Sequence, residues 1–305
     1  MRPLHGIILK IASVLVFITM ASLIKATDGR VPPGEVVFFR SVFAVPIIVA
    51  WLAWRHELAT GFRAKAPMAH VWRGFVGTSA MGLGFAGLLF LPLPEVTAIG
   101  YAAPILTVIF AAMFLGEEVR IFRISAVVLG VIGVLIVLSP RLSVGADLSE
   151  AEALGAMLVL GAAVFAALAQ IFVRRLVQTE STSAIVFWFS ITASGLSLLT
   201  LPYGWVVPGP GDVVLLVLAG LLGGVGQVLL TSSYRHADAS VIAPFEYVSI
   251  LFALAIGYWI FDEVPTLTML GGAALVVLAG VLIIWRERQL GLERGRQRKA
   301  MTPQG

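Results

Sequence analysis

The sequence contains no cysteine and few charged residues. Without cysteine, the 305-residue chain can form neither a disulfide nor a thiolate metal site. Charged residues make up 12% of the chain, about half the fraction typical of a soluble domain, while 59% of the residues are hydrophobic. A soluble protein of this length could not cover its surface with so few charges. The composition therefore favours an integral membrane protein.

Catalytic and nucleotide-binding motifs are also missing. The chain has no HExxH, GxSxG or Walker A motif, and its four histidines are scattered at His5, His56, His70 and His236. We therefore expect a protein that is not an enzyme and that uses no metal or cofactor. Because no site for ATP hydrolysis is present, any transport must draw on an ion gradient, a substrate gradient or a partner protein.

Ten long apolar runs are present, and most have the roughly 20 residues that an α-helix needs to cross a bilayer. They fall at 6–25, 35–54, 72–90, 96–115, 123–139, 153–173, 182–201, 212–233, 240–260 and 267–285. The first run resembles a signal peptide, but Lys10 interrupts it, and we expect it to be kept as a span. The predicted fold is an all-α integral membrane protein with ten transmembrane helices.

The two halves of the chain are similar. Glu118 and Glu263 occupy the segments LGEEVRIF and IFDEVPTL, about 145 residues apart, and five apolar runs fall in each half. An odd number of crossings places the second half upside down relative to the first, as in many secondary transporters. We predict repeats at 1–140 and 141–288 and a basic tail at 289–305. The two glutamates then lie at opposite faces, where we expect structural or gate-end roles.

Basic residues indicate the orientation. With the N-terminus inside, cytoplasmic segments hold sixteen lysines and arginines, including Arg73, while the outer side holds three. This difference predicts that both termini are cytoplasmic. The basic tail could be read as a nucleic-acid patch, but beside a last helix it is more typical of contact with anionic lipid, and we expect no nucleic-acid partner.

Three segments carry a family resemblance. They are FFRS at 38–41, LPLPEVTAIGYAAPILTVIFAAMFLGEEV across the fourth run and YRHADASVIAPFEYVSILFALAIGYWIFDEV across the ninth. Together they resemble the ten-helix EamA branch of the drug/metabolite transporter superfamily, over nearly the whole chain. Within it, the sequence is most similar to bacterial uptake carriers for riboflavin and then for S-adenosylmethionine.

The resemblance implies a secondary transporter of the bacterial inner membrane that moves a small organic metabolite by alternating access. Riboflavin uptake is the first expectation. The alternatives are S-adenosylmethionine uptake and export of amino acids or other metabolites, because exporters in the family share the same broad pattern. A lipid-intermediate flippase or a channel also stays open.

Three ionisable residues lie within predicted spans, at Lys10, Arg40 and Glu246. Such a group is costly in a membrane unless it faces a cavity or a partner, so each is a candidate for contact with the substrate or a coupling ion. Pro244, two residues before Glu246, should kink its helix, and irregular backbone at this depth is tolerated where it lines a cavity or is buried in protein. The alternative for Glu246 is a structural ion pair.

Depth along the spans suggests which charges pair. Glu246 lies roughly 9 Å from the cytoplasmic end of its helix and Arg40 roughly 7 Å from the outer end of its own, so a direct bond between them is disfavoured. The depth-matched pairs are Lys10 with Glu246 and Arg40 with Glu95. For Lys10 we favour the alternative that it extends to the cytoplasmic interface. For Arg40 the alternatives are contact with the substrate or a gate, and a buried brace between helices.

Aromatic and amide side chains complete the candidate site. Tyr101 in the fourth run corresponds in position to Glu246 or Tyr247 in the ninth, and these places should meet between the repeats. Trp188 could stack on a planar ligand, and Gln170 and Gln227 offer amide groups. Glycines in the third and eighth runs predict close packing. In the eighth run Gly220, Gly224, Gln227 and Thr231 share one face, which we expect to line the path. A homodimer is left open.

Overall fold

The protein is helical throughout the part that the structure describes. The computed structural model describes residues 3–27, 29–87, 89–91, 96, 99–116, 121–142 and 150–260, with parts of 267–285. The α-helices are α1 Pro3–Lys25, α2 Pro33–Val42, α3 Ala44–Trp54, α4 Pro67–Gly87, α6 Ala102–Leu115, α7 Ile121–Leu142, α8 Glu150–Leu176, α9 Thr182–Leu198, α10 Pro210–His236, α11 Ala239–Ile242 and α12 Ser249–Ile260. Two 3₁₀ segments, η1 Leu201–Tyr203 and η2 Ala243–Val248, lie between helices.

Several of these helices are suited to a membrane. Four are long and apolar enough to cross one, at Pro3–Ile24, Pro33–Trp54, Ala153–Leu176 and Pro210–His236. Shorter apolar helices occur at Ala102–Leu115, Thr182–Leu198 and Ala243–Phe252. The all-helical membrane fold is therefore confirmed for the described residues, and the expected roles of Glu95, Glu118, Glu263 and the basic tail concern residues outside them.

Local sequence explains where the helices begin and break. Pro33 and Pro210 stand at the starts of α2 and α10, where the missing N–H costs nothing. Ser181 caps α9 by accepting a hydrogen bond from the amide of Ala184. The second apolar run is divided at Phe43, because Pro46 cannot donate a hydrogen bond to the carbonyl of Val42.

The ninth span is broken in the same way. Its helix starts as α11, passes through the 3₁₀ segment η2 and continues as α12. Pro244 lies in η2 and has no amide to bond the carbonyl four residues earlier. The predicted irregularity at Pro244 is confirmed, and Glu246 lies within it.

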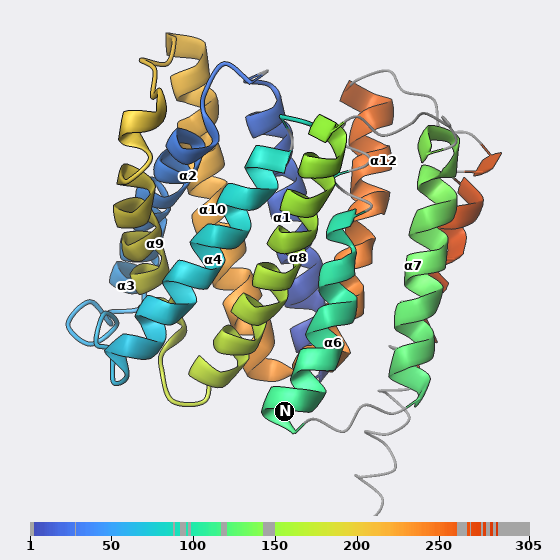
Figure 1. The fold of residues 1–305 in the computed structure, drawn as a ribbon. Helices are drawn as coiled ribbons and strands as arrows, with labels where there is room; N and C mark the ends of the chain where they lie inside the picture. The colour runs from blue at the N-terminus through green and yellow to red at the C-terminus, as the bar shows by residue number, and fades with distance from the viewer. Residues whose placement is uncertain are drawn as a thin grey trace, which may run out of the picture.

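The helices form one bundle, in which segments from the two halves of the sequence alternate (Figure 1). Helix α1 packs along α10, and α4 packs along α8. Helix α2 packs against α9 and α10, while α6 and η2 complete the contacts around α8 and α1. The interface between the halves is therefore built mainly by α1, α4, α8 and α10.

Glycines bring these helices close together. A Cβ on Gly74 of α4 would lie 2.4 Å from Thr192 Cγ2, and one on Gly220 of α10 would lie 2.4 Å from Phe43 Cβ. On the same face of α10, a Cβ on Gly224 would lie 2.9 Å from the carbonyl oxygen of Ala44. Close packing is confirmed, but Gly220 and Gly224 pack against α2 and α3 and do not line an open path. These contacts lie within one chain, so they lend no support to a homodimer.

Candidate functional site

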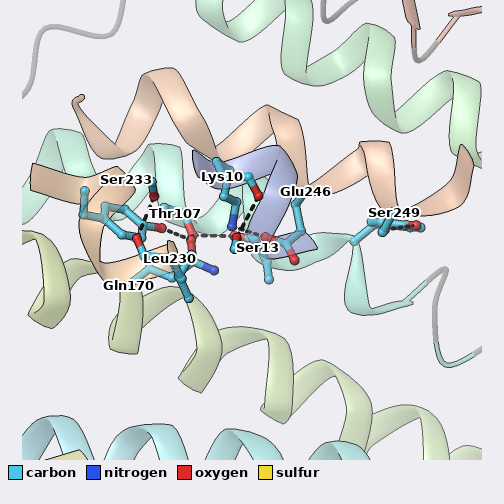
Figure 2. A network of polar contacts seen from close by, with 11 residues as sticks. Lys10, Ser13, Thr107, Gln170, Leu230, Ser233, Glu246 and Ser249 are labelled. Atoms are coloured by element: carbon cyan, nitrogen blue, oxygen red, sulfur yellow. Dashed lines mark hydrogen bonds and ion pairs between the residues drawn. The ribbon is translucent and has the colours of Figure 1, made fainter. Parts of the chain in front are cut away.

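An ion pair joins the first helix to the broken ninth span. The ammonium group of Lys10 bonds Oε2 of Glu246, as Figure 2 shows. Lys10 is 1% exposed, and the side chain of Glu246 is 34% exposed. The depth-matched pairing of Lys10 with Glu246 is therefore confirmed. The expectation that Lys10 extends to the membrane interface is wrong, because a carboxylate within reach inside the bundle offers the ammonium group a better partner.

A hydrogen bond within α1 and the packing of η2 position the ion pair. Ser13, one turn further along α1, donates a hydrogen bond of 2.7 Å to the carbonyl oxygen of Lys10. Because η2 packs against α1, the 3₁₀ segment holds Glu246 at the boundary between the two halves of the chain. The pair thus has one buried member and one partly exposed member.

Two tyrosines meet beside this pair. The rings of Tyr101 and Tyr247 lie 5.4 Å apart, and the Tyr101 hydroxyl is 2.7 Å from the Oγ of Ser249. A Cβ on Gly130 would lie 2.5 Å from the Tyr247 ring, so α7 approaches this ring only because residue 130 is glycine. The predicted meeting of Tyr101 with Tyr247 is confirmed, while the repeat that motivated it stays a prediction.

Gln170 belongs to a second polar cluster on the other side of Lys10 (Figure 2). Its Oε1 accepts a hydrogen bond from the Tyr234 hydroxyl and a longer one, 3.5 Å, from Thr107 Oγ1. Sequence reasoning missed both partners. Tyr234 lies seven residues after Gln227, on the same face of α10, and this spacing could have identified it.

Arg40 lies inside the bundle together with a second arginine. Each of the two residues, Arg40 and Arg73, is 4% exposed. Their guanidinium carbons lie 5.8 and 4.0 Å from the centre of the Phe189 ring. Arg73, counted with the cytoplasmic residues, lies within α4 and is buried in the bundle, and its side of the membrane stays a prediction. The pairing of Arg40 with Glu95 stays a prediction, since Glu95 is not among the described residues.

The two remaining candidate residues, Trp188 and Gln227, lie on different helices. Trp188 is 36% exposed, and its indole N–H donates to the carbonyl oxygen of Phe62 in the loop before α4. This hydrogen bond ties Trp188 to that loop. Gln227 is 7% exposed, within α10, and keeps its place as a candidate.

Two hollows lie elsewhere on the bundle. One of about 460 Å³ runs between α6 and α7 and is lined entirely by apolar residues, among them Ile105, Met113 and Ile132. Another of about 240 Å³ lies between α2, α4 and α9. Neither lining includes Lys10, Arg40 or Glu246. The charged groups are therefore separated from both hollows in this conformation.

Comparison with known proteins identifies the family. Residues 4–139 and, separately, 153–285 match the model of the EamA-like transporter family. The chain belongs to the EamA-like transporter family. Its membership of the drug/metabolite transporter group, expected from the three sequence segments, is thereby confirmed.

Characterised relatives cover nearly the full length. The chain is 29% identical to the pseudopaline exporter CntI of Pseudomonas aeruginosa, over 91% of this chain and 95% of the relative. It is 28% identical to the S-adenosylmethionine uptake transporter of Rickettsia prowazekii, over 87% of each. A solved crystal structure superposes with a TM-score of 0.81 at 19% identity, covering 95% of this chain and 99% of that one, and shows the same fold.

These findings describe a membrane transporter of small molecules. The family and the named relatives indicate a transporter and not an enzyme, and the apolar helices agree with a multi-pass protein of the bacterial inner membrane. The two relatives carry different cargoes in opposite directions. Neither name supports riboflavin, the cargo first expected from the sequence.

Proposed function

We propose that this protein is a secondary carrier that moves a small organic metabolite by alternating access, with Lys10 and Glu246 at the site of binding and coupling. S-adenosylmethionine uptake, the activity named for the Rickettsia relative, is the first choice of cargo. Export of an amino acid or another metabolite is the alternative, because one relative is an exporter. Riboflavin is third.

The ion pair between α1 and η2 is the observation that carries this proposal. Glu246 is accessible, so a proton or a cationic group of the cargo can neutralise it and release Lys10. A buried ammonium group without its carboxylate is unfavourable. Binding at Glu246 would therefore break a contact between the two halves of the bundle. Such a link between binding and a change of conformation is what a coupled carrier needs.

Symmetric packing supports two inverted five-helix repeats. Helix α1 opens the first matched segment and α8 the second, while α4 and α10 are the third spans of their segments. Exchanging the halves turns the contact of α1 with α10 into the contact of α8 with α4, and both are extensive. The ten-helix count, the repeats and cytoplasmic termini are part of the same proposal, together with the excess of basic residues on one side.

Transport by purified protein in proteoliposomes tests the function. We expect saturable uptake of radiolabelled S-adenosylmethionine and counterflow when unlabelled cargo is inside; riboflavin and an amino-acid mixture are run in parallel. Uptake that never saturates and shows no counterflow would indicate a channel. Absence of movement for every cargo, in both directions of the imposed gradient, would remove the proposal.

A further inference from the structure

Two arginines from different helices share one aromatic ring in the interior. Arg40 of α2 and Arg73 of α4 both lie against Phe189 of α9. Phe17 of α1 is 5.9 Å from the Arg40 guanidinium, and a Cβ on Gly223 of α10 would lie 3.1 Å from Arg40 Cγ. Helices of both halves therefore enclose the arginines.

Among the described residues, no acidic side chain pairs with either arginine. In the described part of the chain neither arginine forms an ion pair, and Arg40 Nε, Arg73 Nε and Arg73 Nη1 are buried without a hydrogen-bond partner. The two positive charges also repel one another. Aromatic rings give only partial compensation for burying a guanidinium group. Within the described part of the chain, the two arginines therefore lack an anion.

Glycines make the room that the two arginine side chains occupy. Residue 77 is glycine, and a Cβ there would lie 2.1 Å from Arg73 Nη1. Gly223 likewise lies beside Arg40, so at both positions the lack of a side chain makes room for an arginine. A carboxylate is small, planar and matched to the planar donor groups of arginine.

We propose that Arg40 and Arg73 together bind a carboxylate group of the transported molecule, which rests on the proposed carrier function. Phe17, beside Arg40, lies seven residues along α1 from Lys10, or roughly 10 Å. A cargo that reaches both sites carries a carboxylate at one end and a cationic group, received by Glu246, at the other. The substrate class is an extended zwitterionic metabolite.

A brace between helices is the competing role for the arginines. A bracing arginine would donate hydrogen bonds to side chains or carbonyls, as Arg174 does to the Tyr234 carbonyl and to Asp238. Arg40 and Arg73 instead keep buried N–H groups unused. Removing a brace lowers stability, whereas removing one of two repelling buried charges leaves stability unchanged or raises it.

Binding to purified protein in nanodiscs tests the assignment. The probe is benzoate, with benzamide as its uncharged counterpart and inorganic phosphate as a second anion, measured by calorimetry. We expect benzoate to bind, benzamide not to bind, and Arg40→Gln or Arg73→Gln to weaken benzoate binding at least tenfold. Arg55→Gln is the matched control, because Arg55 is an exposed arginine paired with Glu57, and should bind as the wild type does.

Thermal unfolding of the same variants separates binding from bracing. We expect Arg40→Gln and Arg73→Gln to unfold at or above the wild-type temperature and to lose the stabilisation by benzoate. Lower unfolding temperatures with wild-type benzoate affinity would overturn the proposal, as would equal binding of benzamide or binding of phosphate alone. If a glutamine variant fails to fold, Arg40→Lys and Arg73→Lys are used, because lysine keeps the charge but lacks the planar donor group of arginine. Unchanged benzoate affinity in both lysine variants would also overturn the proposal. Wild-type protein that binds benzoate but transports nothing would remove only the carrier function.

Discussion

Lys10 and Glu246 depend on one another, and the dependence is unequal. Lys10 is almost fully buried, while the side chain of Glu246 is about one-third exposed. Loss of the carboxylate therefore leaves an ammonium group buried without a counter-charge, whereas loss of the ammonium group leaves a carboxylate that water can still solvate. The two single variants should not behave alike.

Glu246→Gln should abolish transport while leaving protein in the membrane. Because Lys10 loses its partner, the free energy of unfolding should fall by roughly 1–3 kcal/mol, less than for a fully buried pair. Proteoliposome uptake and thermal unfolding measure the two effects, with Glu57→Gln, an exposed glutamate paired with Arg55, as control. Unchanged uptake at every pH would show that neither cargo nor proton uses this carboxylate.

The double variant Lys10→Met/Glu246→Gln distinguishes stability from function. Removing both charges replaces the ion pair with neutral groups, so most of the stability lost in Glu246→Gln should return. Uptake should stay absent, since nothing remains to bind or couple. Recovery of uptake in the double variant would reduce the pair to a structural role.

The sequence could predict which residues bear charge within the spans but not where their side chains turn. Depth matching found Lys10 with Glu246, because both lie near the same end of their helices. It left out Arg73, which lies at the start of the predicted run 72–90 and was counted with the cytoplasmic residues, although it is buried within α4. It also missed Tyr234 and Thr107, whose pairing with Gln170 depends on contacts between helices distant in sequence.

At the scale of elements, hydropathy located the spans well and proline determined how they break. The second run contains Pro46 and the ninth contains Pro244, and each corresponds to an interruption that a continuous apolar stretch conceals. The sequence predicted that helices pack closely, but not which helices are in contact. Glycine-rich runs predicted close packing, but which partner each glycine meets follows from the tertiary fold.

Gly74→Val should weaken the packing of α4 on α9. Its Cβ would lie 2.4 Å from Thr192 Cγ2, so the helices must separate, at a cost of about 1–3 kcal/mol. Gly82→Val on the same helix is the matched control, because a Cβ there meets no atom within 4 Å. Thermal unfolding in detergent measures both; equal unfolding temperatures would contradict the close contact.

At the scale of the whole molecule, the absence of cysteine makes orientation directly measurable. Gln178, between α8 and α9, is exposed, and Val207, between α9 and α10, is 97% exposed. With cytoplasmic termini, a membrane-impermeant maleimide should label Val207→Cys in intact cells and Gln178→Cys only after permeabilisation. The reverse pattern would show that the molecule has the opposite orientation.

Hydrogen bonds attach the loop between α3 and α4 to the start of α9, which is distant in sequence. The amides of Lys65 and Ala66 each donate a 2.8 Å hydrogen bond to the buried carboxylate of Glu180, and Ser183 donates to the carbonyl oxygen of Gly61. This loop belongs to the first half of the chain, yet it is fastened to the start of α9 in the second. When the carrier changes conformation, the loop should travel with α9 as one rigid body. The hinge then falls within the first half of the chain, and the unit that moves combines residues of both halves.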